Sequence, residues 1–326
     1  MISEYPGVSV VMPILNEERH LAAAVRRILE QDYPGDLQVI MSIGPSTDRT
    51  HKIAEGLAGA DARLQVVDNP SGRTPAGLNL GIAAADYDII ARVDGHGELT
   101  DGYLRRAVEL LDETGAANVG GVMDAQGQTP FEEAVAYAYT SRLGMGGSKF
   151  HLEESPAGPA DTVFLGVFRK QALLDAGGFD ETLHRAQDWE LNYRLRQRGE
   201  VVWFSPELKV TYRPRSSVRA LAAQFYDTGK WRREVVRRHS DTASLRYLAP
   251  PVTVAGLGIG TAGGLAGMIT NKLILKLGWL APVGYLLLIM VGSVTARGLS
   301  QQARARLPIV LIIMHLAWGT GFLVGL

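Results

Sequence analysis

Residues 87–96 read YDIIARVDGH. The stretch 87–93, apolar except for Asp88 and Arg92, predicts a buried β-strand, and an aspartate, a glycine and a histidine follow it directly. Asp94 offers a carboxylate and His96 an imidazole, while Gly95 lets the backbone approach a ligand closely. The pair could bind a divalent cation, Mn²⁺ in preference to Ca²⁺, that bridges the oxygens of a diphosphate. A turn capped by the aspartate is the plain alternative.

The surrounding sequence alternates between apolar runs typical of strands and amphipathic stretches typical of helices. Strands are expected at residues 8–14, 37–43, 64–68 and 87–93, and helices at 18–30, 48–57 and 74–85. Such alternation predicts an α/β domain with a mostly parallel sheet and helices on both faces. In sheets of this kind ligands bind beyond the carboxyl ends of the strands. The polar residues that follow the first, second and fourth strands therefore mark one candidate site.

A second candidate lies at residues 187–190, which read QDWE and open an amphipathic helix that runs to about residue 198. A carboxylate at the start of a helix, such as that of Asp188, often serves only as a cap. The same carboxylate could act as a general base that removes a proton from a hydroxyl group. Both interpretations of Asp188 stay open on the residues alone.

Charge divides the chain into three parts. Residues 1–212 carry 19 Lys and Arg against 31 Asp and Glu, a net charge of −12. Residues 213–246 carry nine basic residues against three acidic ones, and residues 247–326 hold five basic residues and no acidic one. We expect a soluble domain, then a basic amphipathic segment that lies on anionic lipid, then a membrane domain. A solvated basic helix is the alternative for the middle segment.

The C-terminal part contains three stretches without a formal charge, at 248–269, 277–296 and 307–326. Each has about the length that crosses the hydrocarbon core of a bilayer, and a buried helical core is the alternative. The distribution of Lys and Arg favours a multi-pass protein of the cell inner membrane, with a cytoplasmic N-terminal domain and an outward C-terminus. Gly256, Gly260 and Gly264 would suit close helix association and a homo-oligomer.

The chain contains no cysteine, which excludes disulfides, thiolate metal ligands and cysteine nucleophiles and fits a reducing compartment. The apolar run 8–15 is short and lacks a basic leader, so we expect no secretory signal there. As partners we expect membrane lipids and no nucleic acid.

Taken together, the motifs resemble a known family. They lie at residues 13–17, 46–50, 76–81, 92–96, 177–181 and 187–191. In this order they resemble the inverting family-2 glycosyltransferases of the GT-A fold, a Rossmann-like fold with a mixed, mostly parallel sheet. The DGH triplet and the QDWELNYRLR run are especially similar to bacterial glucosyltransferases of the succinoglycan-biosynthesis type. The resemblance covers about residues 6–240, and a C-terminal membrane region is also typical of such enzymes.

The resemblance implies a membrane-anchored enzyme that moves a sugar from a nucleoside-diphosphate sugar, a UDP-sugar being favoured, to a lipid-linked or saccharide acceptor. Such an enzyme would act in exopolysaccharide or glycolipid biosynthesis. Asp188 would be the catalytic base, and Asp94 with His96 would hold Mn²⁺ or Mg²⁺. The donor would be bound by Pro13, Asn16, Glu17, Ser46, Asp48, Asn79, Arg92 and Asp94. Residues near the acceptor or the diphosphate would be Gln187, Trp189, Glu190, Gln224, Lys230 and Trp231.

Two departures from the family pattern bear on the alternatives. Relatives commonly carry an acidic residue just before the serine of the second loop, whereas residues 42–46 here read SIGPS. The stretch 224–231 is longer than the QxxRW signature of processive synthases and has a lysine before its tryptophan. This departure argues against a processive polysaccharide synthase, which stays one alternative, and a non-enzymatic membrane scaffold or sugar-nucleotide sensor is another. A nucleotidyltransferase would need a Gly-rich, basic phosphate loop near the N-terminus, and residues 13–19 do not form one.

Overall fold

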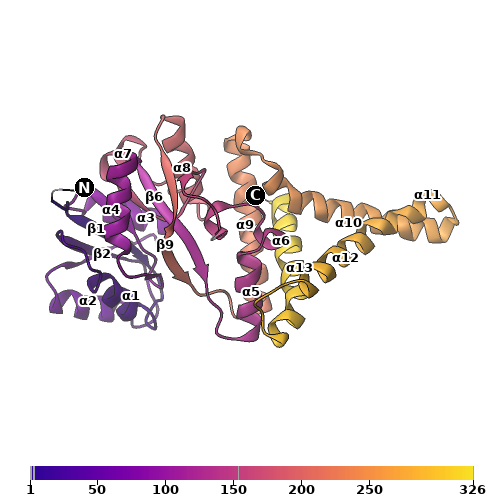
Figure 1. Cartoon of the computed structure of the whole chain (residues 1–326), viewed down its shortest axis with the longest axis horizontal. Helices are drawn as coiled ribbons and strands as arrows, with labels where there is room; N and C mark the ends of the chain where they lie inside the picture. The colour runs from indigo at the N-terminus through magenta and orange to yellow at the C-terminus, as the bar shows by residue number, and fades with distance from the viewer. Residues whose placement is uncertain (1, 3, 153, 326) are drawn as a thin grey trace. The chain divides into compact units, whose positions relative to one another are not determined.

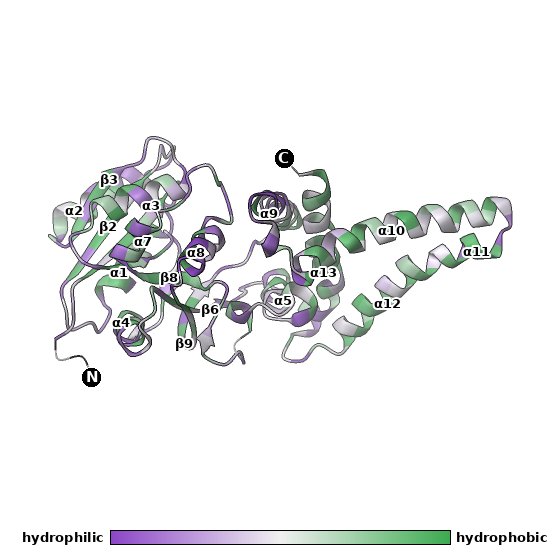
Figure 2. Ribbon diagram, turned by 90° about the horizontal axis from the view of Figure 1, so that it is seen from above, coloured by the Kyte–Doolittle hydropathy of each residue, from purple (hydrophilic) through white to green (hydrophobic). Residues whose placement is uncertain are grey.

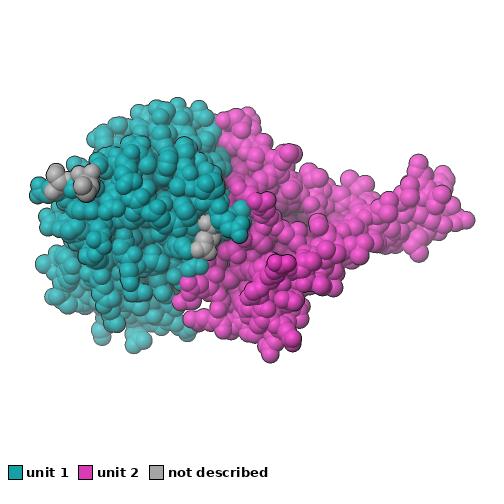
Figure 3. Space-filling view, viewed as in Figure 1, with its two compact units in different colours: residues 1–124, 149–212 teal, residues 125–148, 213–326 magenta. Residues whose placement is uncertain are grey.

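The computed structural model describes residues 2, 4–152 and 154–325 and divides into two compact units (Figure 3). The first unit contains the residues up to 124 together with 149–212, and the second contains 125–148 and the residues from 213 onward. Residues 125–148, which the sequence analysis includes in its soluble domain, thus pack with the C-terminal helices. The three-part division into soluble, interfacial and membrane parts stays a prediction.

The first unit is built on a nine-stranded sheet of order β3-β2-β1-β4-β8-β6-β9-β5, with β7 paired to β9. The strands are β1 (Val8–Ile14), β2 (Leu37–Ile43), β3 (Leu64–Asp68), β4 (Ile89–Arg92), β5 (Glu98–Leu99), β6 (Asn118–Ala125), β7 (Gly158–Pro159), β8 (Phe164–Arg169) and β9 (Val202–Tyr212). Strands β3, β2, β1 and β4 are parallel, and β4 pairs with β8 in the antiparallel sense. The sheet is therefore mixed, and the four strands expected from the sequence form its parallel part.

Helices cover both faces of this sheet (Figure 1). They are α1 (Leu21–Leu29), α2 (Thr50–Ala60), α3 (Thr74–Ala83), α4 (Tyr103–Thr114), α7 (Lys170–Asp175) and α8 (Gln187–Gln197). Along β1, Val10 and Met12 belong to the core shared with α1 and α4, whereas Val11 belongs to the core shared with α3, α7 and α8. This alternation follows from the two-residue repeat of a strand, and it explains why the central strands are apolar on both faces.

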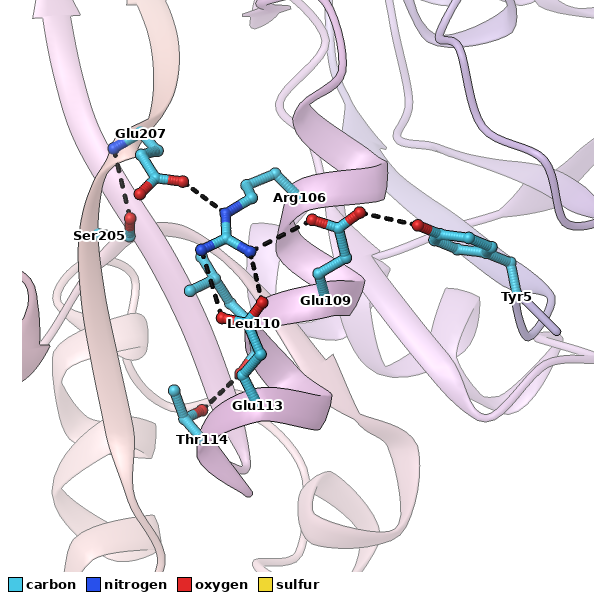
Figure 4. A network of polar contacts seen from close by, with 8 residues as sticks. All are labelled: Tyr5, Arg106, Glu109, Leu110, Glu113, Thr114, Ser205 and Glu207. Carbon is cyan, nitrogen blue, oxygen red and sulfur yellow. Dashed lines mark hydrogen bonds and ion pairs between the residues drawn. The ribbon is translucent and has the colours of Figure 1, made fainter. Parts of the chain in front are cut away.

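A polar network ties α4 to the sheet edge (Figure 4). Arg106 contacts Glu109 and Glu113 on its own helix and Glu207 on β9. Tyr5 donates a hydrogen bond to Glu109 at 2.7 Å, so the network also reaches the N-terminal segment. These side chains are partly or largely exposed, and each pair contributes about 1 kcal/mol or less.

The second unit is helical. Its helices are α5 (Pro130–Tyr139), α6 (Arg142–Met145), α9 (Val218–Arg238), α10 (Leu245–Thr270), α11 (Leu273–Lys276), α12 (Leu280–Val294) and α13 (Gln301–Val324), with short 3₁₀ turns at Ser240–Thr242 and Leu277–Trp279. Helices α5, α9 and α13 lie side by side, while α10 and α12 form a hairpin that runs away from them (Figures 1 and 2). A capping box between Thr129 and Glu132 starts α5.

Three segments of this unit are long and apolar enough to cross a membrane: 245–270, 273–294 and 301–324. They overlap the stretches expected from the sequence, although residues 295, 296 and 325 lie beyond the ends of the helices and residue 326 lies outside the described residues. Gly260 and Gly264 pack within the hairpin, because a Cβ on Gly260 would lie 2.6 Å from the carbonyl oxygen of Gly278 and one on Gly264 would lie 2.7 Å from Trp279. These glycines therefore serve close packing inside the chain and give no support to a homo-oligomer.

Helix α9 packs its apolar face inside the second unit, where Leu221, Phe225 and Val235 are buried. Lipid would therefore meet other faces of α9, and the interfacial placement of this segment stays a prediction. The ring of Phe225 lies 6.4 Å from that of Trp318 on α13. The apolar stripe of α9 is covered by a protein helix, which the composition of α9 alone could not distinguish from a lipid surface.

Candidate active site

Arg92 joins the two carboxylates that the sequence analysis singled out. It is the last residue of β4, and its Nη2 and Nε donate to Asp94 Oδ1 at 3.0 and 3.2 Å. Its Nη1 donates to Asp188 Oδ1 near the start of α8. The Arg92 side chain is 7% exposed, whereas those of Asp94 and Asp188 are 29% and 37% exposed. A buried cation thus holds together two carboxylates that lie closer to solvent.

The charge of this triad is set by competing effects on Arg92. Burial by itself lowers the pKa of the guanidinium, but the carboxylates of Asp188 and Asp94 outweigh it and raise the pKa above its ordinary value. Arg92 therefore stays cationic, and with two carboxylates around it the triad favours a further cation nearby.

Glu17 and His96 form a second pair at the same edge of the sheet. His96 Nδ1 lies 2.9 Å from Glu17 Oε1, and since a carboxylate only accepts, Nδ1 is the donor. Because Nδ1 contacts Glu17, Nε2 is the ring nitrogen that would bind a metal. Gly95 permits the approach, because a Cβ there would lie 3.0 Å from Glu17 Cγ. The expected contact of Glu17 with a nucleoside stays a prediction.

Asn16, Ser46 and Asp48 connect the loops that follow β1 and β2. Asn16 adopts a positive φ of 55°, its Oδ1 accepts from the Thr47 backbone at 2.8 Å, and its own N–H donates to Ser46 Oγ at 3.0 Å. Asp48 accepts from the backbone of Glu18 at 3.1 Å. These hydrogen bonds tie the loop after β1 to the loop after β2, and the two loops form the rim of the site. Pro13 lies next to the end of β1, paired in register with Ser42.

Asn79 on α3 anchors the segment that leads into α8. Its Nδ2 donates to the Phe179 carbonyl and to Glu181 at 2.9 Å each, and its Oδ1 accepts from the Phe179 N–H at 2.8 Å. These contacts tie α3 to residues 179–181, and the expected contact of Asn79 with the donor stays a prediction.

The first turn of α8 contains the other predicted residues. Glu190 pairs with Arg194 at 2.7 Å, and Arg194 also donates to the Gly178 carbonyl at 2.8 Å, so Glu190 stabilises the helix and the preceding loop. Trp189 stacks on Tyr193. Gln187 is 8% exposed, and its Oε1 has no partner within the described residues.

The three remaining predicted residues, Gln224, Lys230 and Trp231, lie on α9 in the second unit. Their placement near an acceptor stays a prediction.

The donor groups fit a cation that is shared with a phosphate ligand. Among the described residues, no group of three or more His, Asp or Glu side chains could hold a metal by itself. Asp94 and His96 offer one carboxylate and one imidazole. Mg²⁺ and Mn²⁺ that act on phosphates commonly take one or two such ligands and complete their shell with phosphate oxygens and water.

Asp94, His96 and Asp188 stand out in the sequence motifs, whereas Arg92 and Glu17 were expected only to take general donor-binding roles. One signal was present, because Arg92 and Asp94 are two residues apart and a strand places such residues on the same face. The contact of Arg92 with Asp188 spans 96 residues of sequence and has no local signal.

The fold and motifs agree with a family match. Residues 9–175 match the model of glycosyl transferase family 2, and the chain belongs to this family. Its mixed sheet and its helices on both faces are those of the GT-A class, as the resemblance implied.

Individual relatives extend the match to nearly the whole chain. The chain is 32% identical over 317 residues to the succinoglycan biosynthesis protein ExoA of Rhizobium meliloti (strain 1021), covering 96% of this chain and 93% of that protein. It is 23% identical over 240 residues to a dolichyl N-acetyl-alpha-D-glucosaminyl phosphate 3-beta-D-2,3-diacetamido-2,3-dideoxy-beta-D-glucuronosyltransferase of Methanococcus voltae, covering 71% and 74%.

A solved structure supports the fold. The mannosyltransferase PcManGT from Pyrobaculum calidifontis, in complex with GDP-Man and Mn²⁺, matches with a TM-score of 0.62 and 18% identity, covering 96% of this chain and 86% of that one. The predictions of a family-2 glycosyltransferase, a GT-A fold and a transferase activity are confirmed.

Proposed function

We propose that this glycosyltransferase is a membrane-anchored, inverting enzyme that transfers a sugar from a nucleoside-diphosphate sugar to a lipid-linked or saccharide acceptor in exopolysaccharide or glycolipid biosynthesis. The observation that carries the proposal is the contact of Arg92 with both Asp94 and Asp188. That contact fixes the carboxylate of Asp94, at the end of a strand, beside that of Asp188, at the start of a helix. Asp94 would serve the leaving group and Asp188 the incoming hydroxyl. The similarity to a succinoglycan biosynthesis protein supports the biosynthetic context.

In the proposed reaction, Asp188 removes the proton from an acceptor hydroxyl while the hydroxyl oxygen attacks the anomeric carbon. The bond to the diphosphate breaks on the opposite side, so the configuration inverts. Arg92 contacts Oδ1 of Asp188, which leaves Oδ2 to receive the proton.

Asp94 and His96 would hold a divalent metal, with Glu17 orienting the imidazole of His96. The metal would supply charge stabilisation for the departing diphosphate. The Mn²⁺ in the similar solved structure supports this assignment.

The test compares Asp188→Asn with Asp175→Asn, an exposed position at the end of α7. Purified variants are screened with UDP-, GDP- and dTDP-sugars in Mn²⁺ and Mg²⁺, measuring donor binding by calorimetry and transfer by product formation. Removing a general base typically costs a factor of about 10² to 10⁴. We expect such a loss in Asp188→Asn with donor binding retained, and no loss in Asp175→Asn. Unchanged turnover in Asp188→Asn would refute its role as the base.

A further inference from the structure

The third apolar helix, α13, is lined by helices α5 and α9 (Figures 1 and 2). At its beginning, the N–H and Oγ of Ser300 both donate to Glu133 of α5, at 2.6 Å each. Further along, His315 Nε2 lies 2.8 Å from the Leu143 carbonyl of α6. Contacts with α5 and α6 thus hold α13 from its first turn onward.

The contacts between α9 and the end of α13 are the closest. A Cβ on Gly229 would lie 2.0 Å from the carbonyl oxygen of Trp318, and one on Gly321 would lie 2.0 Å from that of Tyr226. Arg233 donates to the Leu323 carbonyl at 2.7 Å and to the Phe322 carbonyl at 3.3 Å, so it caps the last turn of α13. The C-terminal end of α13 therefore lies at the same level as the middle of α9.

Helix α9 is not suited to the hydrocarbon core. It carries eight charged residues: Arg219, Asp227, Lys230, Arg232, Arg233, Glu234, Arg237 and Arg238. Ionisable groups at the centre of a bilayer are costly, and several on one helix would oppose its insertion. If α13 crossed the membrane to an outward C-terminus, its contacts with Arg233 and Gly229 would draw this charged helix in with it.

The α10–α12 hairpin, in contrast to the charged helix α9, exposes many large apolar side chains. Its strongly exposed large apolar residues include Val252, Ile259, Met268, Ile269, Leu280, Leu287 and Val291. In the described part of α13, the exposed large apolar residues are Ile309, Leu323 and Val324. The 26 residues of α10 reach about 39 Å, more than the roughly 30 Å of a hydrocarbon core. Lys272 and Lys276 lie at the tip, where headgroups would meet them.

We propose that the α10–α12 hairpin crosses the bilayer and that α13 does not, lying instead with α5 and α9 in a layer at the membrane surface. The C-terminus is then on the same side as the catalytic unit. The short connection keeps the catalytic unit on the same side of the membrane as α9, because β9 ends at Tyr212 and α9 begins at Val218. Six residue steps span roughly 20 Å at most, less than the core of a bilayer. The proposal replaces the expected three spans and outward C-terminus.

The test uses the absence of cysteine from the chain. Single cysteines are introduced at three exposed positions: Ala60→Cys on α2 of the catalytic unit, Thr270→Cys at the hairpin tip and Val324→Cys at the end of α13. Intact cells and inverted membrane vesicles are treated with a membrane-impermeant maleimide, and labelling in detergent gives the total for each variant. We expect Ala60→Cys and Val324→Cys to react in the same preparation, and Thr270→Cys in the other.

Reaction of Val324→Cys in the preparation opposite to Ala60→Cys would overturn the proposal, since it would require α13 to cross. Reaction of Thr270→Cys together with Ala60→Cys would overturn it as well, because the hairpin would then not cross. Leu323→Cys and Ile269→Cys supply a second exposed position at each end should a first variant fail to accumulate. The labelling does not depend on transferase activity, so this result is separable from that of the proposed function.

Discussion

At Arg92, one buried guanidinium contacts carboxylates from two segments that are distant in sequence. Arginine suits this position because its planar fork can donate to both at once, whereas a lysine offers a single compact charge. The geometry of Asp188 relative to Asp94 therefore depends on the shape of this side chain as well as on its charge.

Arg92→Lys tests that dependence. The variant keeps the positive charge but holds one carboxylate at a time, so we expect kcat to fall by about 10- to 100-fold with a smaller change in the KM for the donor. Steady-state kinetics measure kcat and the KM for the donor separately, and a thermal melt checks that the fold is retained. A change confined to KM would argue that Arg92 serves donor binding alone.

Glu17 is the residue that orients His96. Glu17→Gln keeps the side-chain shape but removes the negative partner of the imidazole, and mutations of such supporting partners typically weaken metal binding about 10- to 100-fold. We expect that loss in a calorimetric titration of donor with Mn²⁺. Glu18→Gln is the matched control, since Glu18 contacts Arg49 and not His96. Equal behaviour of the two variants would contradict the assignment.

At the scale of elements, the two loops that frame the site are held by Asp48. The hydrogen bond from the Thr50 hydroxyl is the largest cause that lowers the pKa of Asp48 below its ordinary value of 3.8, with backbone N–H donors adding to it. A carboxyl group with a lowered folded-state pKa stabilises the protein above its unfolded pKa, and this contribution is lost as the pH falls through the folded pKa.

Asp48→Asn should therefore be less stable than the unmodified chain near pH 7, and the difference should shrink below about pH 4. Denaturant unfolding of both proteins at several pH values measures it. A difference that stays constant down to pH 3 would show that the charge of Asp48 is not the cause.

The crossing of α9 and α13 depends on a glycine. A Cβ on Gly229 would be 2.0 Å from a backbone oxygen, so Gly229→Ala must push two helices apart, and overpacking of this kind costs about 1–3 kcal/mol. Gly256→Ala is the control, because a Cβ there meets nothing within 4 Å. Thermal melts in detergent should show a lower Tm for Gly229→Ala only, and equal Tm values would contradict the close contact.

At the scale of the whole molecule, the chain combines an acidic catalytic part, a basic connection and an apolar hairpin. The helical unit is joined to the sheet by three connections, from β6 to α5, from α6 to β7 and from β9 to α9. A hairpin that crosses and returns would leave both ends of the chain on the side where the sugar donor is used.

The sequence by itself determined the parallel half of the sheet and the location of three apolar helices, and its short motifs pointed to Asp94, His96 and Asp188, whose roles stay a prediction. These features depend on local periodicity, on uncharged length and on short motifs, all of which are contiguous in the chain. Helix α8 was expected at the same place for the same reason.

Only the tertiary structure decided which of these groups meet. The contact of Arg92 with Asp188, the anchoring of residues 179–181 by Asn79 and the burial of α9 against α13 all join segments far apart in sequence. An apolar stripe has the same composition whether lipid or a helix covers it, and a buried arginine reveals its partners only when the strands and helices are assembled.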